Sequence, residues 1–308
     1  MAPSSPATAT DYTVVIPAFN ASATLARALD SVMAQTVPAR EVIVVDDGSP
    51  DRADIARIVA GYGGRVTLLL QDNAGPAAAR NAGVRASGGE WIAFLDADDS
   101  WLPHKMQAQL ALASDADVGL LHGAARVDRM SLPAEMGFDL LWRANRICTS
   151  MTVVRRSAFE RLGGFFEAQG LIGAEDYNLW LRIAHAGWRV RACEGLVGHY
   201  TPAEGSLTSR IERCALAEMR NARELGELLG LSRRDIRWKL RTIRTDFARH
   251  LIHARDPLPA RRLLVHALFE RPTLERIVLM SVISYVPTPL LDMRRRLRKG
   301  GQQTLYSL

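Results

Sequence analysis

The first hundred residues alternate between short β-rich runs and stretches of helical spacing, and this alternation constrains the fold more than any other feature. The predicted strands are Tyr12 to Ile16, Glu41 to Val45, Arg65 to Leu70 and Trp91 to Leu95. Between them, apolar residues recur every three or four positions, as in amphipathic helices. Strand-helix-strand units of this kind connect parallel strands in one sheet. The sequence therefore predicts an α/β domain with a Rossmann-like, mixed but mainly parallel sheet flanked by helices.

Each predicted strand runs into a polar loop. In parallel sheets ligands bind beyond the carboxyl ends of the strands, so these loops should share one edge. We expect Pro17, Ala18 and Phe19, which follow the first strand, to contact a ligand there. No GxGxxG motif follows that strand and no Walker A motif is present, which argues against the usual dinucleotide and P-loop sites.

The run WIAFLDADDS places three carboxylates in four residues at the end of a predicted buried strand. Side chains two apart on an extended chain point the same way, so Asp96 and Asp98 can converge on one cation. Oxygen ligands of this type suit Mg²⁺ or Mn²⁺. The alternative is that Asp98, Asp99 or Ser100 caps a helix that begins near Pro103.

Periodicity predicts further elements as far as Ala192. Residues 126 to 146 lack clear periodicity, and we expect them to form a variable segment that faces the substrate. The other predicted elements are a helix at Met106 to Ala113, strands at Val118 to His122, Thr149 to Val154 and Trp188 to Ala192, and helices at Ser157 to Leu162 and from Glu175 to about Gly187.

Beyond Ser206 the pattern becomes helical throughout. One apolar stripe includes Ala215 and Leu225, and another, from Ile236 to Phe247, follows a near capping box that begins at Ser232. We therefore predict a disordered lead-in at residues 1–10, a main domain at 11–205 and a helical region at 206–308.

Charge and cysteine content bear on compartment and partners. The chain has a net charge of +6, but Arg210 to Gly300 alone contains 21 Lys and Arg against 10 Asp and Glu, so an anionic surface is a plausible neighbour for this third. The three cysteines, Cys148, Cys193 and Cys214, form no CxxC pair, which favours a reducing compartment without structural zinc. The first residues lack the features of an export signal, so we expect a cytoplasmic protein.

Six segments together resemble the family 2 glycosyltransferases of GT-A fold over roughly residues 11 to 210. They are TVVIPAFN, VIVVDDGS, DNAGPAAARNAG, WIAFLDADD, VVRRSAFERLGGF and GAEDYNLWLRI. The resemblance implies transfer of a sugar, with inversion, from a nucleotide-diphosphate sugar, with a UDP-sugar favoured, to a glycan or lipid-linked acceptor. Polysaccharide or glycolipid assembly would be the setting.

The resemblance assigns roles on the donor side. Asp96 and Asp98 match the DXD motif, where Mn²⁺ or Mg²⁺ would stabilise the departing diphosphate, and Asp96 and Ala97 would lie against the nucleotide. Asp47 would bind the base; by its residue type alone it could equally close a turn. Arg80 follows Pro76 by about one helical turn and would contact the anionic nucleotide, with an exposed salt bridge as the alternative.

On the acceptor side, the resemblance makes Asp176 the general base, with Glu175 orienting its neighbours or binding acceptor. The alternative is that both are first-turn acids stabilised by the helix dipole. The family often has a basic residue or His shortly before a Ser-x-Thr. Here Ser206-Leu207-Thr208 is present but His199 is offset, so a third metal ligand stays open.

Other classes of function stay open as well. A catalytically silent nucleotide-sugar binding or scaffold protein would share the fold. Nucleic-acid binding through the basic third is disfavoured, because its Arg residues are dispersed with little aromatic interleaving. Within Ile277 to Lys299, an apolar run of about 15 residues is short for a bilayer span, which needs about 20. The run and the basic residues after it resemble an interfacial element on an anionic membrane. A final core helix with a solvated tail is the alternative.

Overall fold

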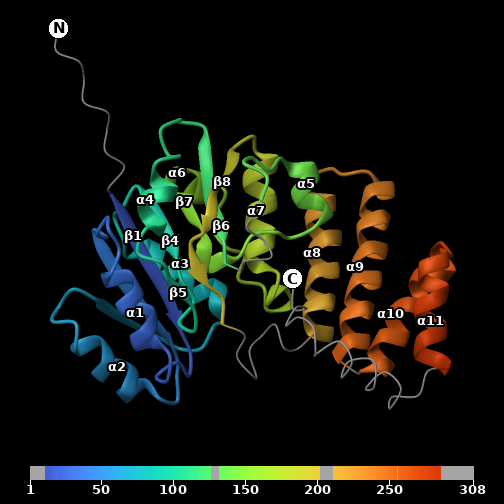
Figure 1. Cartoon of the computed structure of the whole chain (residues 1–308), viewed down its shortest axis with the longest axis horizontal. Helices are drawn as coiled ribbons and strands as arrows, with labels where there is room; N and C mark the ends of the chain where they lie inside the picture. Colours follow the sequence, from blue (N-terminus) through green and yellow to red (C-terminus); the bar gives the residue numbers. More distant parts are fainter. Residues whose placement is uncertain (1–10, 126–131, 202–210, 255, 286–308) are drawn as a thin grey trace, which may run out of the picture. The chain divides into compact units, whose positions relative to one another are not determined.

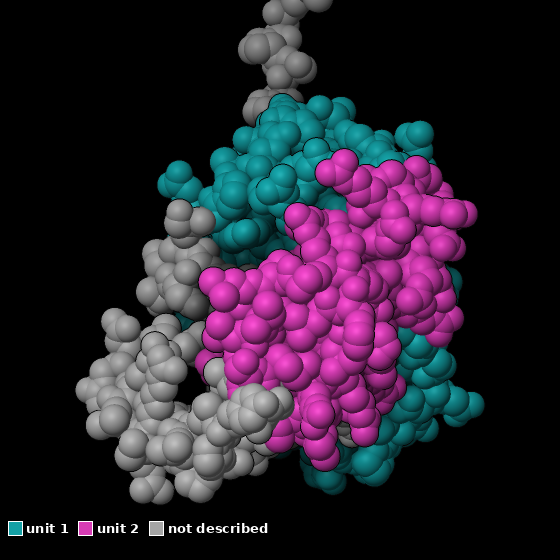
Figure 2. Space-filling model, turned by 90° about the vertical axis from the view of Figure 1, so that its right-hand side faces the viewer, with its two compact units in different colours: residues 1–204 teal, residues 205–308 magenta. Residues whose placement is uncertain are grey.

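The computed structural model describes residues 11–125, 132–201, 211–254 and 256–285, with the side chains of the last four excluded. The chain divides into two compact units, Met1–Glu204 and Gly205–Leu308, which Figure 2 distinguishes by colour. This division falls beside the boundary expected near residue 205. The predicted lead-in at residues 1–10, the Ser206-Leu207-Thr208 motif and the basic end of the tail lie outside the described residues.

Unit 1 is built on a seven-stranded mixed sheet of order β3-β2-β1-β4-β7-β6-β8, flanked by helices (Figure 1). The strands on the β3 side, all parallel, are β1 (Tyr12–Ala18), β2 (Glu41–Asp47), β3 (Thr67–Gln71) and β4 (Trp91–Phe94). β7 (Val153–Arg155) runs antiparallel to β4 and to β6 (Val118–Ala124), and β6 is parallel to β8 (Arg189–Leu196). The predicted mainly parallel α/β sheet is therefore confirmed.

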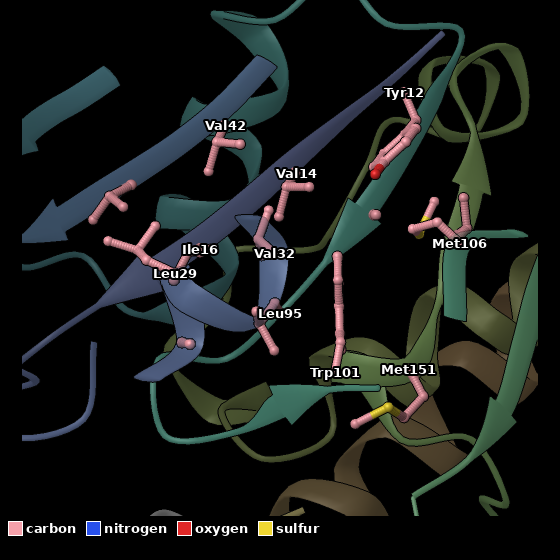
Figure 3. Packing of buried hydrophobic residues seen from close by; sticks show 14 of the residues in the cluster. Tyr12, Val14, Ile16, Leu29, Val32, Val42, Leu95, Trp101, Met106 and Met151 are labelled. Carbon is pink, nitrogen blue, oxygen red and sulfur yellow. The ribbon is translucent and has the colours of Figure 1, made fainter. Parts of the chain in front are cut away.

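Alternate side chains of the central strands enter different cores. On one face Val14 and Ile16 of β1 pack with Leu29 and Val32 of α1 (Leu25–Met33) and with Ile55 of α2 (Arg52–Ala60), as Figure 3 shows in part. On the other face lies α3 (Pro76–Arg85), which begins with the predicted Pro76. A Cβ at Gly83 of this helix would stand 2.4 Å from a methyl of Val15. The lack of a side chain at Gly83 thus lets α3 pack directly against the sheet, and this packing fixes the directions of the α3 side chains.

The second half of unit 1 carries shorter helices. These are α4 (Lys105–Leu110), α5 (Phe138–Arg143), α6 (Arg156–Arg161) and α7 (Glu175–His185), with a 3₁₀ turn η3 at Gln169–Leu171. In the segment predicted as variable, residues 126–131 are outside the described part, but α5 is a regular helix. Its Leu141 and Trp142 are buried, and the Leu141 carbonyl accepts a hydrogen bond from the hydroxyl of Tyr177. Part of this segment therefore packs as core.

The predicted strand at Thr149 to Val154 is wrong in its first half. Thr149–Met151 forms a 3₁₀ turn, η2, and only Val153–Arg155 is a strand. The Trp101 indole N–H donates to the Ser150 carbonyl at 2.6 Å, and the Gln109 amide donates to the Met151 carbonyl at 2.7 Å. Side chains distant in sequence thus donate hydrogen bonds to carbonyls that would pair with a neighbouring strand if this run were extended.

Unit 2 is helical, as predicted. Its helices are α8 (Ile211–Leu228), α9 (Arg233–Ala254), α10 (Pro257–Glu270) and α11 (Leu274–Tyr285). The Ser232 hydroxyl accepts the Asp235 amide at 3.1 Å, which confirms the helix start, and the stripe from Ile236 to Phe247 is buried. No helix in the described part of the chain is both long and apolar enough to cross a bilayer.

Candidate active site

The loops after β1 and β2 meet at one edge of the sheet. Pro17 and Ala18 belong to β1 itself, where they pair with Val45 and Asp46, so the strand runs two residues further than predicted. The next residue, Phe19, is 54% exposed at the edge. The Asn20 amide, on a residue with φ of 52°, donates to the Ser49 hydroxyl at 3.1 Å. Of the three predicted ligand contacts, Phe19 is therefore the most accessible.

Asp46 and Asp47 both have protein partners. Asp46 accepts the Ser49 amide and pairs with Arg52 at 2.6 Å. The Asp47 carboxylate accepts the side-chain amide of Gln71 at 2.7 Å and the backbone amides of Ala74 and Gly75 at 2.8 and 2.9 Å. Asp47 thus anchors the loop between β3 and α3, and its expected contact with a nucleotide base stays a prediction.

Arg80 lies at the centre of the acidic side chains. It is 4% exposed and donates to Asp96 at 2.6 Å and to Glu175 at 3.0 Å, so the alternative of an exposed salt bridge is wrong, while the expected nucleotide contact stays a prediction. Burial alone would lower the pKa of Arg80, but the attraction of Asp96 and Glu175 outweighs it and raises the pKa above its usual value. One guanidinium therefore joins the Asp96 turn to the start of α7.

The turn from Asp96 to Asp99 concentrates negative charge. Burial, and then the charge of Asp96, raise the pKa of Asp98. The same two causes raise the pKa of Asp99 to about 7, although its carboxylate accepts the Ser150 hydroxyl at 2.5 Å and the Thr201 amide at 2.8 Å. These acids do not cap α4, whose first turn starts at Lys105 after His104, with no side-chain cap. The capping alternative is therefore wrong.

The two acids at the start of α7 differ in their surroundings. Glu175 is 6% exposed and has Arg80 on one oxygen and the Gly173 amide on the other, at 2.6 Å. Asp176 accepts the Thr149 hydroxyl at 2.5 Å and the Tyr177 amide at 2.6 Å. Burial, followed by the charge of Glu175, raises the pKa of Asp176 to about 6. The Asp176 carboxylate is therefore more basic than that of an ordinary aspartate, a property that suits a general base.

A short second sheet lies beside the Asp96 turn. β5 (Ser100–Trp101) pairs antiparallel with β9 (Gly198–His199), with Ser100 opposite His199. Arg27 of α1 donates to the Asp98 carbonyl at 2.5 Å and to the Thr201 hydroxyl at 3.2 Å. The pairing brings the exposed His199 next to the turn. Within the described ranges, no group of three or more His, Cys, Asp or Glu residues is placed to hold a metal ion.

The residues at this turn suit a divalent cation supplied with further ligands by water and substrate. The Asp96 side chain is 33% exposed, and burial, followed by the charge of Asp96, raises the pKa of Asp98; a cation would offset the second cause. Mg²⁺ is commonly held by one or two carboxylates together with substrate phosphates.

Sequence reasoning missed four of the residues around these acids, namely Arg27, Thr149, Ser150 and Thr201. The only sequence signal for any of them was the pair of hydroxyl residues, Thr149 and Ser150, inside a run that was predicted to be a strand.

Comparison with known proteins agrees with this arrangement. Residues 13–163 match the sequence profile of "Glycosyl transferase family 2". That segment contains β1 to β4, Arg80 and the Asp96 turn. These residues belong to glycosyl transferase family 2. Three further site residues, Glu175, Asp176 and Thr201, lie beyond the matched segment.

Two relatives show the range of names in the family. The chain is 35% identical over 225 residues to the succinoglycan biosynthesis protein ExoO of Rhizobium meliloti, with 66% of this chain and 64% of ExoO aligned. It is 28% identical over 183 residues to WfgD of Escherichia coli, named a UDP-Glc:alpha-D-GlcNAc-diphosphoundecaprenol beta-1,3-glucosyltransferase, with 56% and 70% aligned. The alignment with ExoO thus spans somewhat less than two thirds of that relative's length.

The fold is that of the GT-A glycosyltransferases. The mannosyltransferase PcManGT from Pyrobaculum calidifontis, solved in complex with GDP-Man and Mn²⁺, superposes with a TM-score of 0.58 at 20% identity, over 96% of this chain and 88% of PcManGT. At this identity the likeness concerns the fold alone.

Proposed function

We propose that the chain transfers a sugar from a nucleotide-diphosphate sugar to an acceptor hydroxyl with inversion. The observation that carries this proposal is the buried Arg80, which contacts Asp96 and Glu175 together and so links the acidic turn after β4 to the start of α7, where Asp176 has a raised pKa. A displacement of this kind needs both features: charge stabilisation at the leaving diphosphate and a base at the acceptor hydroxyl. A UDP-sugar is the favoured donor, since the relative WfgD is named for UDP-Glc.

In this proposal Asp96 and Asp98 hold Mn²⁺ or Mg²⁺, which would stabilise negative charge on the diphosphate. Phe19 and Asp47 lie on the donor side with Pro17, Ala18 and Ala97. Arg80 keeps Asp96 and Glu175 in place and supplies a fixed positive charge near the phosphates. Asp176 accepts the proton of the acceptor hydroxyl, and Glu175, held on both oxygens, orients the start of α7.

Asp176→Asn tests the assignment of the base. The amide is nearly isosteric and cannot accept the proton, so nucleotide binding should persist while transfer is lost. Titration calorimetry with UDP and Mn²⁺ measures binding, and a panel of UDP-sugars with candidate glycan acceptors measures transfer. Near-normal kcat in this variant would mean that the base lies elsewhere. A wild-type chain that binds donor but neither transfers nor hydrolyses it would favour the silent binding protein.

We also propose that the enzyme works at the cytoplasmic face of the membrane on a lipid-linked acceptor, the kind of acceptor named for WfgD. The α11 side chains Leu274, Ile277 and Val278 are 79%, 48% and 50% exposed, which supports shallow insertion among anionic lipids. The predicted segment continues to Lys299, but residues 286–299 are outside the described part. Flotation with anionic vesicles tests this proposal: Leu274→Ser with Ile277→Ser should rise less than wild type, and equal flotation would reject it.

A further inference from the structure

The η2 turn lies between the two groups of acids and contacts both through adjacent hydroxyls. The Ser150 hydroxyl donates to Asp99 at 2.5 Å and accepts the Asp96 amide at 3.1 Å. The Thr149 hydroxyl donates to the Asp176 carboxylate at 2.5 Å. One turn of three residues therefore sets the position of the cation-binding turn and of the proposed base.

The turn is itself fixed by buried hydrogen bonds. Thr149 is 6% exposed and Ser150 and Met151 are fully buried. Beyond the bonds from Trp101 and Gln109 to its carbonyls, the Thr152 hydroxyl donates to the Thr149 carbonyl at 2.7 Å. Because two of these donors come from β5 and α4 and the third from the residue after the turn, the backbone of the turn is held at each of its three residues. The Thr149 side chain thus presents its hydroxyl from a rigid base.

We propose that Thr149 is a positioning residue that orients Asp176 and stabilises its ionised form, so that it sets the acidic limit of activity. The proposal rests on the assignment of Asp176 as the base. Thr149 supplies a donor to one carboxylate oxygen while the Tyr177 amide occupies the other. A hydroxyl can donate one hydrogen bond, and an ionised carboxylate is the stronger acceptor.

The groups around Asp176 shift its pKa in both directions. Burial and Glu175 raise the pKa of Asp176, while the Thr149 hydrogen bond, the Arg80 charge and the Tyr177 amide lower it. The Cys148 thiol, next to Thr149, also interacts with Asp176. Loss of the Thr149 hydroxyl removes a contribution that lowers the pKa, so Asp176 would stay protonated to higher pH.

Thr149→Val removes the hydroxyl and keeps the shape, and Thr149→Ser keeps the hydroxyl. We expect the acidic limb of the kcat/KM profile of Thr149→Val to move to higher pH, with about a tenfold loss at pH 6 and a smaller one at pH 9. The Kd for UDP with Mn²⁺ should not change, because Thr149 contacts no donor-side residue. Thr149→Ser should retain the wild-type profile.

Thr152→Val is the matched control. It removes a buried hydroxyl that donates to a carbonyl of the same turn and to no carboxylate, so it should lower Tm without moving the pH profile. An unchanged profile in Thr149→Val, or an equal shift in Thr152→Val, overturns the proposal. If Thr149→Val does not fold, as judged by circular dichroism, Thr149→Ala makes the same comparison.

Asp176→Asn, assayed in parallel, separates the two proposals. If it is inactive while Thr149→Val keeps the wild-type profile, the assignment of the base stands and the positioning role is wrong. If Asp176→Asn retains near-normal kcat, the base is misassigned, and the proposed role of Thr149 is then wrong as well.

Discussion

The carboxyl ends of β2 and β4 both carry acidic side chains at the same edge of the sheet, yet these carboxylates differ in their surroundings. At the end of β2, Asp46 and Asp47 are matched by an arginine, a side-chain amide and three backbone amides. After β4, burial and mutual repulsion raise the pKa values of Asp98 and Asp99. The acids at the end of β2 stabilise a loop, whereas Asp98 and Asp99 have raised pKa values although their neighbour Asp96 pairs with Arg80 at 2.6 Å.

The same contrast recurs within one residue pair on α7. Glu175 has a donor on each oxygen, one of them the buried Arg80, and acts as an anchor. Asp176 also has a donor on each oxygen, but both donors are neutral and its pKa is raised. The charge of the donors, rather than their number, therefore distinguishes the two acids.

The largest expected effect comes from Asp96→Ala with Asp98→Ala. This variant should lose activity on the order of 10³-fold or more, because charge stabilisation at the diphosphate is removed. Mn²⁺ at about 100 times its Kd should stabilise wild type by about 2.7 kcal/mol and the variant by nothing. Thermal shift with and without chelator measures this. The matched control is Asp54→Asn on the exposed face of α2, which should respond as wild type does; undiminished wild-type turnover in excess chelator would contradict the metal role.

Asp47→Asn should produce the opposite pattern. An amide cannot accept hydrogen bonds on both of its terminal atoms, so one of the Ala74, Gly75 or Gln71 donors loses its partner at a cost of about 2 kcal/mol. Urea unfolding measures the loss, and the Mn²⁺ shift should persist. If the variant had wild-type stability but no longer responded to Mn²⁺, Asp47 would support the cation site rather than the loop, and the distinction between the two regions would be wrong.

Ser49→Ala should have the smallest effect. Its hydroxyl accepts the Asn20 amide, so its removal should cost about 1 kcal/mol and leave the Mn²⁺ shift intact. The midpoint of urea unfolding is the measurement. A loss of the Mn²⁺ response here would show that the first turn also supports the cation site.

Local patterns were enough to predict the strands, the acids at their ends and the capping box at Ser232. The surroundings of those acids were not predictable, because they depend on residues distant in sequence. For Arg80, nucleotide contact or an exposed salt bridge was predicted, but helical position alone does not reveal that Asp96 and Glu175 enclose it. η2 was taken for strand because its apolar neighbours outweigh two hydroxyl residues, and the pairing of β5 with β9 involves segments of two residues that carry no periodicity.

The hydrogen bonds that assemble the site close very long stretches of chain. Arg80 reaches Asp96 across 16 residues, but Glu175 across 95, and Asp99 meets Thr201 across 102. Ordering such contacts costs loop-closure entropy that only the folded body can repay. During synthesis the acidic turn therefore emerges long before Thr201, and its hydrogen bonds are completed only once Thr201 has left the ribosome. A fragment that ends at residue 163, where the family match ends, would contain Arg80 and the Asp96 turn but neither Glu175 nor Thr201.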